Sequence, residues 1–422
     1  MTSINIPYGK TYIEVQIPKE RLEGILESRA HNYKPEAGEE ELVRRALENP
    51  IASPRLRDLA KGHKKIVIIT SDHTRPVPTK ISAPLLLAEI RSGSPDADIT
   101  FLVATGFHRA TTQEELLDKF GEHMFNTEKI VVHNCWDKDS MLTAGKLPSG
   151  GDLVINRLAI EADLLISEGF IEPHLFAGFS GGRKSVLPGI VSEVTVLANH
   201  CSEFIAHEKA RAGILEGNPM HEDMLFAARQ AKLAFIMNVV IDADKKIIRA
   251  FAGDLEQAHL AGCRFAGELA AVKAKPADIV ITSNGGYPLD QNIYQHVKAL
   301  SSAEATCKTG GVIIACAALS DGHGSEDLYN WLRDGARAAT DKIMKIDRES
   351  TIPDQWATQI MARIMLKHTV FFVTDQCDHK IIEDMGFKAA LTIKEALSRA
   401  EEIVGSNAGI TVIPDGVAVI IS

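Results

Sequence analysis

The sequence lacks several patterns that would assign it to a common class of protein. Its six cysteines include no Cys-x-x-Cys pair, which argues against a zinc ribbon or a thioredoxin-like site and fits reduced thiols in a cytosol. It contains no His-Glu-x-x-His motif and no cluster of carboxylates and histidines at zinc spacing. No apolar run approaches the roughly 20 residues that cross a bilayer. The first residues also lack a basic start followed by an apolar core, so we expect no signal peptide and no membrane segment.

An excess of positive charge is also missing. The formal net charge is -10, which argues against a nucleic-acid partner because phosphate binding needs clustered Lys and Arg. The hydrophobic content of 45% and charged content of 24% are typical of a soluble globular protein. We therefore expect a cytoplasmic enzyme with two or three domains over the 422 residues.

Short apolar runs alternate along the chain with amphipathic helical segments. This alternation predicts an α/β fold with two domains and largely parallel sheets. We expect an N-terminal α/β domain over 1–268, a linker over 269–276 and a C-terminal α/β domain over 277–422, whose last strand is a candidate to pack back on the first domain. The strands that we expect span 11–17, 65–70, 98–104, 129–133, 164–167, 233–241, 246–250, 278–282, 311–316, 370–374, 410–413 and 417–421.

Several helix boundaries follow from local signals. Thr111 and Glu114 have the spacing of a capping box, and Ser192 is placed to cap a helix that runs to about Ala212. Further helices are expected over 40–49, 81–90 and 291–300, and after Ser325 and Thr392.

Polar and glycine-rich loops follow the central strands. Ligands of parallel α/β sheets bind beyond the carboxyl ends of the strands. Asp72 and Arg75 follow one such strand, His108 follows the next, and His174 follows a third. We therefore expect the active site at these ends, in a cleft between the two domains.

The stretch 172–189 contains four glycines and an Arg-Lys pair. It is too glycine-rich for a helix or a strand interior. Residues 178–185 differ by one residue from a Walker A phosphate loop, because Arg183 stands where the last glycine would be. Pro188 also argues against the helix that follows a phosphate loop. Lys184 is a candidate phosphate cation, a candidate nucleophile, or an ordinary surface lysine.

Three histidines are candidates for chemistry. His108 and His174 each lie in a loop past a strand, where two acid/base groups on opposite sides of a substrate would serve two enantiomers. The alternative for both histidines is a structural role, either at the surface or hydrogen-bonded in the core. His200 lies in a segment that reads as a helix, with Phe204 on the same face, and a lone helical histidine is more often structural than a metal ligand.

Two further groups are ambiguous. Asp72 and Arg75 form either an ion pair or a site in which Arg75 binds a carboxylate or phosphate. Tyr294 and Lys298 are four residues apart on an expected helix, with Gln295 beside them, and such a trio is usually a solvated face.

Taken together, these residues resemble the lactate racemase family, the nickel-pincer-nucleotide 2-hydroxyacid racemases and epimerases. The motifs run in family order from residue 71 to 298: Ser71-Asp72-His73-Thr74-Arg75-Pro76, Gly106-Phe107-His108-Arg109, Glu172-Pro173-His174, Ser180-Gly181-Gly182-Arg183-Lys184-Ser185, Asn199-His200 and Tyr294-Gln295-x-x-Lys298.

The resemblance implies a role for each matching residue. Lys184 matches the lysine that is joined covalently to the cofactor, a pyridinium-3,5-bisthiocarboxylic acid mononucleotide that carries nickel. His200 matches the one protein ligand of nickel, while the cofactor supplies two sulfurs and a carbon. His108 and His174 match the paired acid/base histidines. The residues that match others lining the active site are Asp72, Arg75, Tyr294, Gln295 and Lys298, and Trp356 is a weaker match to a pocket tryptophan.

The resemblance also implies a reaction and partners. Hydride would leave a 2-hydroxycarboxylic acid for the cofactor and return to either face of the planar 2-keto acid, with the histidines handling the hydroxyl proton. The expected partners are a small 2-hydroxyacid and cofactor-synthesis proteins. The alternative from another class is a phosphate- or nucleotide-binding protein that uses loop 178–185.

Overall fold

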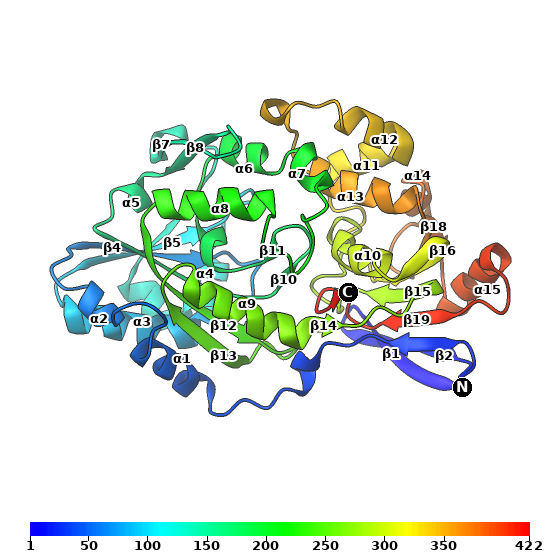
Figure 1. Ribbon diagram of the computed structural model, residues 1–422, viewed down its shortest axis with the longest axis horizontal. Coiled ribbons are helices and arrows are strands. Elements are labelled where there is room, and N and C mark those ends of the chain that lie inside the picture. The colour runs from blue at the N-terminus through cyan, green and yellow to red at the C-terminus, as the bar shows by residue number, and fades with distance from the viewer. The chain divides into compact units, whose positions relative to one another are not determined.

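The chain divides into two units, each assembled from separate segments of the sequence (Figure 1). The computed structural model describes the backbone of residues 1–422 and every side chain except that of His31. The central unit comprises residues 29–200 and 207–269. The terminal unit comprises residues 1–28, 201–206 and 270–422.

The central unit is built on a six-stranded sheet in the order β13-β12-β9-β4-β5-β6. All neighbours are parallel except β12 and β13, which pair antiparallel. Strands β4 and β9 are buried along almost their whole length, as expected of continuous apolar runs covered on both faces. The strands are β4 Lys65–Ser71, β5 Asp98–Ala104, β6 Lys129–Val132, β9 Leu164–Phe170, β12 Leu233–Ile241 and β13 Ile247–Gly253.

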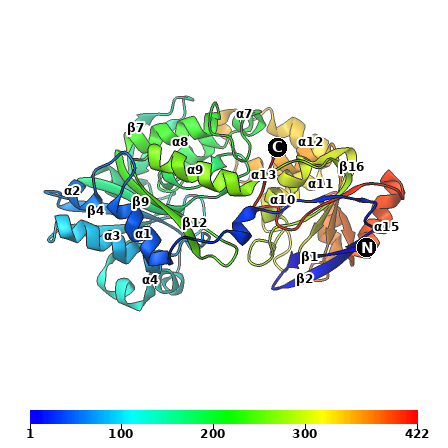
Figure 2. The ribbon, with the colours of Figure 1, turned by 60° about the horizontal axis from the view of Figure 1, so that its bottom comes forward.

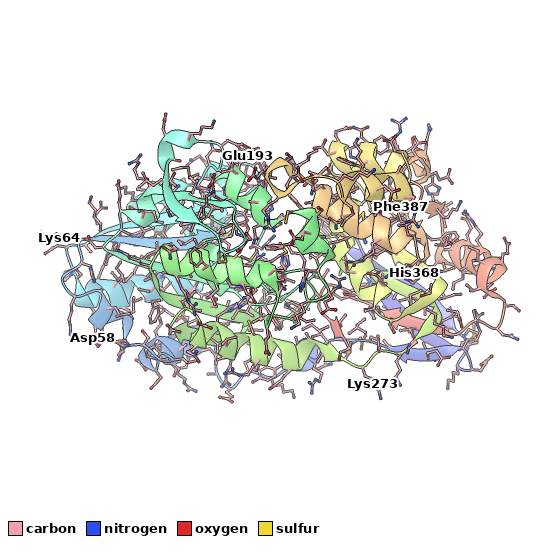
Figure 3. The ribbon with its side chains drawn as sticks, turned by 45° about the horizontal axis from the view of Figure 1, so that its top comes forward. Asp58, Lys64, Glu193, Lys273, His368 and Phe387 are labelled. Carbon is pink, nitrogen blue, oxygen red and sulfur yellow. The ribbon has the colours of Figure 1, made fainter. Side chains whose placement is uncertain are left out.

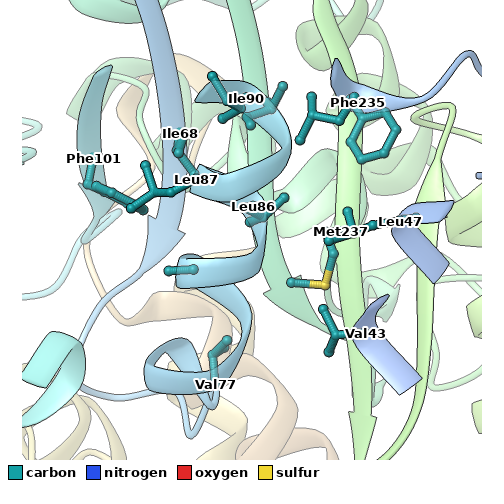
Figure 4. Packing of buried hydrophobic residues seen from close by; sticks show 14 of the residues in the cluster. Val43, Leu47, Ile68, Val77, Leu86, Leu87, Ile90, Phe101, Phe235 and Met237 are labelled. Carbon is teal, nitrogen blue, oxygen red and sulfur yellow. The ribbon is translucent and has the colours of Figure 1, made fainter. Parts of the chain in front are cut away.

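Helices cover both faces of this sheet, with α1 and α3 on one side and α8 and α9 on the other (Figure 2). The α1 and α3 side holds a packed core in which Ile68, Leu86 and Phe101 have no exposed surface (Figure 4). The ring of Phe101 meets that of Phe120 edge to face at 5.2 Å. The helices are α1 Glu39–Glu48, α2 Leu56–Leu59, α3 Thr79–Gly93, α4 Gln113–Thr127, α5 Arg157–Ile160, α6 Glu193–Asn199, α8 Pro219–Gln230 and α9 Gln257–Ala270.

Two small antiparallel pairs complete the central unit. Strands β7 Met141–Lys146 and β8 Asp152–Asn156 form a hairpin, and β10 Pro173–His174 pairs with β11 Gly178–Phe179. The second pair lies inside the glycine-rich stretch. Lys64 precedes the first residue of β4 and lies at the rim of the unit (Figure 3). The loops that carry Asp72, His108 and His174 leave from the opposite, carboxyl ends of the strands.

Two predictions about this unit were wrong in detail. The capping box at the start of α4 consists of Thr112 and Glu115, one residue later than expected. The helix that starts after Ser192 ends at Asn199, and His200 is its C-terminal cap. Phe204 belongs to a separate short helix, so it does not share a helix face with His200.

The terminal unit has an all-parallel six-stranded sheet in the order β18-β17-β16-β15-β19-β3. An antiparallel ribbon of β1 and β2 packs on one face of it, where Ile6 and Ile17 join a core with Ile281. The strands are β1 Thr2–Tyr8, β2 Thr11–Ile17, β3 Leu22–Ile25, β14 Ala271–Val272, β15 Ala277–Ser283, β16 Cys307–Cys316, β17 Thr369–Val373, β18 Lys388–Ala390, β19 Ile410–Ile413 and β20 Ile420–Ile421.

The helices of the terminal unit include two that begin at predicted caps. Ser325 Oγ accepts a hydrogen bond from the Leu328 amide, and Thr392 Oγ1 accepts one from Glu395. The expected helix over 291–300 is instead a 3-10 turn, Tyr294–His296, followed by an α-helix from Val297. The helices are α7 Ser202–Ala206, α10 Val297–Glu304, α11 Glu326–Arg333, α12 Ala336–Ile343, α13 Gln355–Met365, α14 His379–Asp384 and α15 Ile393–Val404.

The predicted α/β class with two largely parallel sheets is confirmed. The strand expected over 417–421 is shorter, since only Ile420–Ile421 is paired. Within the described residues, none of the helices has both the length and the apolar character that crossing a bilayer requires. The division of the chain at 269–276 and the cleft between domains stay predictions.

Candidate active site

Asp72 and His108 form a hydrogen-bonded pair at the carboxyl ends of the adjacent strands β4 and β5. Asp72 Oδ2 accepts a hydrogen bond from His108 Nδ1 at 2.7 Å. The carboxylate is 2% exposed, whereas 46% of the His108 side chain is exposed. Asp72 Oδ1 accepts two more hydrogen bonds, from the amide and the hydroxyl of Thr74. The carboxylate is therefore held rigidly from beneath while the histidine ring reaches outward.

The charge state of Asp72 follows from these contacts. Burial raises the pKa of Asp72. The hydrogen bond and charge of His108, the charge of Arg75 and the Thr74 hydroxyl lower the pKa by more than burial raises it, so that it falls to about 2. Asp72 is thus ionised at neutral pH. Since a carboxylate only accepts, His108 Nδ1 must donate its hydrogen, and the neutral ring keeps a lone pair on Nε2. In its neutral form His108 therefore has the tautomer that a general base needs.

A second buried carboxylate supports the same strand ends. Glu168 in β9 is 1% exposed and accepts hydrogen bonds from the hydroxyls of Thr70, Thr79 and Ser82. These hydroxyls come from β4 and α3, so the carboxylate links two strands and a helix directly below the loop of Asp72. Three hydroxyl donors satisfy a buried carboxylate without a direct ion pair.

His174 and Lys184 form the second pair of the site. His174 lies in β10 and Lys184 in a 3-10 turn, Gly182–Ser185, and their Nε2 and Nζ atoms are 3.4 Å apart. The Ala177 amide donates to His174 Nδ1 at 3.3 Å. In a neutral ring Nε2 then carries the hydrogen and points at the lysine. His174 is therefore held in the tautomer opposite to that of His108.

Lys184 is held in an environment that disfavours its charge. Burial, then the charges of Arg183 and Arg75, lower the pKa of Lys184 well below its usual value, and Glu172 acts weakly in the opposite direction. A neutral amine has a lone pair that accepts the His174 Nε2 hydrogen. An uncharged lysine in such a site is a nucleophile.

Phe176 joins this pair to His200. Its ring meets His174 at 4.6 Å and His200 at 5.4 Å, both edge to face, and the Lys184 ammonium position is 5.9 Å from it. His200 is 6% exposed. The ring therefore separates two histidines in a largely apolar surrounding.

His200 has the features of a single metal ligand. Its Nδ1 donates to the Val196 carbonyl at 3.0 Å, which fixes the ring and leaves the lone pair on Nε2. Burial above all lowers the pKa of His200, to about 3, so the imidazole is neutral as a ligand must be. Among the described residues no group of three His, Cys, Asp or Glu side chains is placed to hold a metal ion.

The residues of the near-Walker stretch do not form a phosphate loop. Gly182–Ser185 is one 3-10 turn rather than the start of a helix, and Ser185 Oγ donates to the Gly182 carbonyl. Arg183 is turned into the protein interior, where it is 1% exposed. The geometry does not support a Walker-type phosphate loop over residues 178–185.

Comparison with known proteins places the chain. Residues 8–213 match the family of lactate racemase N-terminal domains, and residues 272–421 match that of lactate racemase C-terminal domains. The chain belongs to the lactate racemase family. It is 56% identical over 423 residues to the lactate racemase of Thermoanaerobacterium thermosaccharolyticum, covering 100% of this chain and 99% of the relative. It is 54% identical to that of Lactiplantibacillus plantarum, covering 100% of both.

A solved structure agrees with this assignment to the lactate racemase family. The lactate racemase apoprotein from Thermoanaerobacterium thermosaccharolyticum matches with a TM-score of 0.97 at 55% identity, covering 100% of both chains. A Thermotoga maritima protein with a TM-score of 0.67 is 18% identical and shares the fold. The predicted family and the prediction of an isomerase are confirmed. Membership implies a racemase that depends on a cofactor and acts on a small molecule.

The remaining family-matched residues lie in the terminal unit. Tyr294, Gln295 and Lys298 are all partly exposed. The Tyr294 hydroxyl accepts a hydrogen bond from Trp356 Nε1 at 3.2 Å. The pairing supports the weaker match of Trp356. In the central unit the structure pairs Asp72 with His108 and groups His174, Lys184 and His200 around Phe176. That these two groups form one site with the terminal-unit residues stays a prediction.

Sequence reasoning missed three contributors to the site. Phe176 contacts both histidines and Lys184, and its only signal was an aromatic residue inside a glycine-rich loop. Glu168 was visible as one charged residue within an apolar strand. Thr74 gave no signal beyond its place in the loop.

Proposed function

We propose that the chain interconverts the stereoisomers of a short 2-hydroxycarboxylic acid such as lactate, using a nickel-pincer nucleotide. Pyridinium-3,5-bisthiocarboxylic acid mononucleotide with nickel would be bound covalently by Lys184, with His200 as the protein ligand of the metal. The observation behind the proposal is the pair of histidines, each fixed by a hydrogen bond at Nδ1, that follow the two strands flanking β4. A neutral histidine can accept a proton, and the imidazolium that results can give one.

The two histidines exchange protons with the substrate hydroxyl. When bound, the cofactor supplies a hydride acceptor next to the substrate α-carbon. His108 Nε2 takes the hydroxyl proton of one enantiomer, and the ionised Asp72 stabilises the imidazolium that forms. His174 serves the second enantiomer: in its imidazolium form it donates a proton to the oxygen as hydride returns to the planar 2-keto acid, and it becomes neutral, and in the reverse direction it accepts that proton again.

The substrate carboxylate needs a cation close to these histidines. Arg75 is partly exposed, and its guanidinium donates to the Thr74 hydroxyl at 3.1 Å, which orients it beside the Asp72 loop. It is the proposed partner for the substrate or for the cofactor, together with Asp72. Tyr294, Gln295 and Lys298 are proposed substrate-binding residues on their match to the family motif.

Loading of the cofactor would involve cofactor-synthesis proteins as partners. A cytoplasmic location is proposed because all six cysteines are unpaired and five are buried, which suits a reducing compartment.

Intact-mass measurement and nickel analysis of active enzyme test the proposal. We expect an adduct on Lys184, one nickel bound, and loss of optical purity from D- or L-lactate within a panel of 2-hydroxyacids. Lys80, an exposed lysine of α3, provides the control Lys80→Ala, which should keep both adduct and activity. Active enzyme without an adduct on Lys184 would refute the mechanism.

A further inference from the structure

Arg183 is the largest fully buried side chain of the described residues. Its guanidinium donates to three backbone carbonyls of the same loop, those of Ala177 at 2.6 Å, Phe179 at 2.7 Å and Gly181 at 3.3 Å. Its Nε donates to His221 Nδ1 at 3.0 Å. One side chain therefore ties together the connection between β10 and β11, β11 itself and the start of the turn that holds Lys184.

The bonding of Arg183 is unusual for a buried charge. A buried charged side chain is normally paired with an opposite charge. Among the described residues no carboxylate forms an ion pair with Arg183, and its donors go to carbonyls and to histidine nitrogen. Burial lowers the pKa of Arg183 to about 10, so it stays charged at neutral pH. The protein keeps an uncompensated cation directly beside Lys184.

A chain of hydrogen bonds leads from Arg183 through Ala177 and His174 to Lys184, the next residue in the sequence. The guanidinium holds the carbonyl of Ala177, and the amide of Ala177 donates to His174 Nδ1. This amide fixes the hydrogen of the neutral ring on Nε2, 3.4 Å from Lys184 Nζ. An ammonium at Nζ would oppose that N–H group, whereas an amine accepts from it.

We propose that Arg183 is a positioning residue that prepares Lys184 for covalent modification. It fixes the backbone that sets the tautomer of His174 and presents Lys184 Nζ to that ring. The inference rests on the proposed function only for the identity of the modifying group, because the preparation of the amine belongs to the chain itself.

The loop leaves little freedom for another arrangement. Gly181 and Gly182 have φ of +76° and +52°, and a Cβ on Gly182 would lie 2.6 Å from the His259 ring. The charged and titratable groups around Lys184 are Arg183, Arg75, His174 and His200, which disfavour its charge or contact it, and Glu172, which favours it. Arg183 is the one of these whose side chain donates to three carbonyls of the loop backbone.

Competitive acetylation of the full-length chain without cofactor tests the proposal. Acetic anhydride is applied from about pH 6 to about pH 10, and peptide masses report Lys184 against the exposed Lys80. In wild type we expect Lys184 to reach half-maximal reactivity at a lower pH than Lys80. Arg183→Met and Arg183→Lys should each lower Lys184 labelling at about pH 8 by roughly tenfold. Arg229→Met removes an exposed arginine of α8 and should change nothing.

Three outcomes would overturn the proposal. One is wild-type Lys184 that labels no more readily than Lys80. Another is a folded Arg183→Lys that labels like wild type, and this milder variant decides the matter where Arg183→Met does not fold. The third is a ¹⁵N NMR spectrum that places the neutral-ring hydrogen of His174 on Nδ1. Absence of nickel and adduct from active enzyme would instead refute the proposed function and leave these results standing.

Discussion

Replacing Asp72 by Asn tests the contact that keeps His108 ready as a base. The substitution preserves the size of the side chain and removes its charge. An Asn oxygen can still accept from His108 Nδ1, but the amide loses the charge assistance that stabilises an imidazolium. We expect kcat to fall while the substrate KM changes less, because the imidazolium exists only during turnover.

The magnitude follows from the contacts of Asp72. A hydrogen bond to a charged group contributes ~1.5–3 kcal/mol against ~0.5–1.5 kcal/mol for a neutral one, and a difference of about 1.4 kcal/mol is about tenfold in rate. The pKa of this carboxyl falls from 3.8 to about 2. The lowering remains after burial has raised the pKa, so the contacts outweigh the cost of burial, and the loss of charge assistance gives an expected fall in kcat of about tenfold.

Polarimetry of purified enzyme, started from either enantiomer, measures the effect. For a substrate with one stereocentre the two enantiomers have equal free energy, so kcat/KM must fall equally in both directions, which checks the assay internally. Nickel content and adduct mass of Asp72→Asn must equal those of wild type, so that poor loading is not read as poor catalysis. Asp118→Asn, an exposed carboxylate of α4, is the matched control.

A loaded Asp72→Asn enzyme with kcat within about twofold of wild type would refute the reasoning, since the charge would then contribute below ~0.5 kcal/mol. A loss confined to KM would equally refute it, because Asp72 would then bind substrate rather than orient His108.

Other outcomes follow from the same structure. Because the pKa of Asp72 is lowered by folding, its stabilisation of the folded state should be complete above about pH 4 and lost as pH falls through about 2, measured as the urea unfolding difference from Asp72→Asn. Phe101→Ala should cost ~3–5 kcal/mol of unfolding free energy, because the ring is fully buried. Gly181→Ala should lower the Lys184 adduct, since φ is +76° and the new Cβ would lie 2.8 Å from a carbonyl oxygen. His200→Ala should lose nickel in metal analysis while the adduct mass remains.

Each of these has a result that would contradict it. If the unfolding free-energy difference between wild type and Asp72→Asn did not change with pH, the partners of Asp72 would not favour its ionised form. A cost below ~1 kcal/mol for Phe101→Ala would mean that the core repacks. Full loading of Gly181→Ala would show a loop that tolerates a side chain, and full nickel in His200→Ala would place the metal elsewhere.

The strands and loops of the central unit were predictable because parallel strands covered on both faces are continuous apolar runs. The run Lys65–Ser71 and the polar loop after it are such a case, and the order of the strands follows from parallel pairing. The same logic put Asp72, His108 and His174 at one edge of a sheet before their contacts were known.

The end of the helix after Ser192 and the hydrogen bonds of Arg183 could not be predicted, because both depend on the backbone of segments distant in the sequence. Local periodicity continued a helix from Ser192 towards Ala212, but it ends at His200, whose ring bonds the carbonyl four residues back, and residues 201–206 pack in the other unit. The link from Arg183 through Ala177 to His174 consists of bonds to main-chain carbonyls and amides. Side-chain identities do not encode where those groups point.

The terminal unit is assembled from segments that are far apart in the sequence, and this sets an order for folding during synthesis. The ribbon β1–β2 and the edge strand β3 leave the ribosome first, but their partners β15 and β19 lie beyond residue 276. The 29–200 and 207–269 segments emerge in between. Because domains fold as units while the chain grows, β3 cannot pair and the β1–β2 ribbon cannot pack on its sheet until β15 and β19 have been made. Nascent chains stalled after residue 269 should therefore expose the unpaired strand β3 and the apolar face of the ribbon, a natural substrate for chaperones.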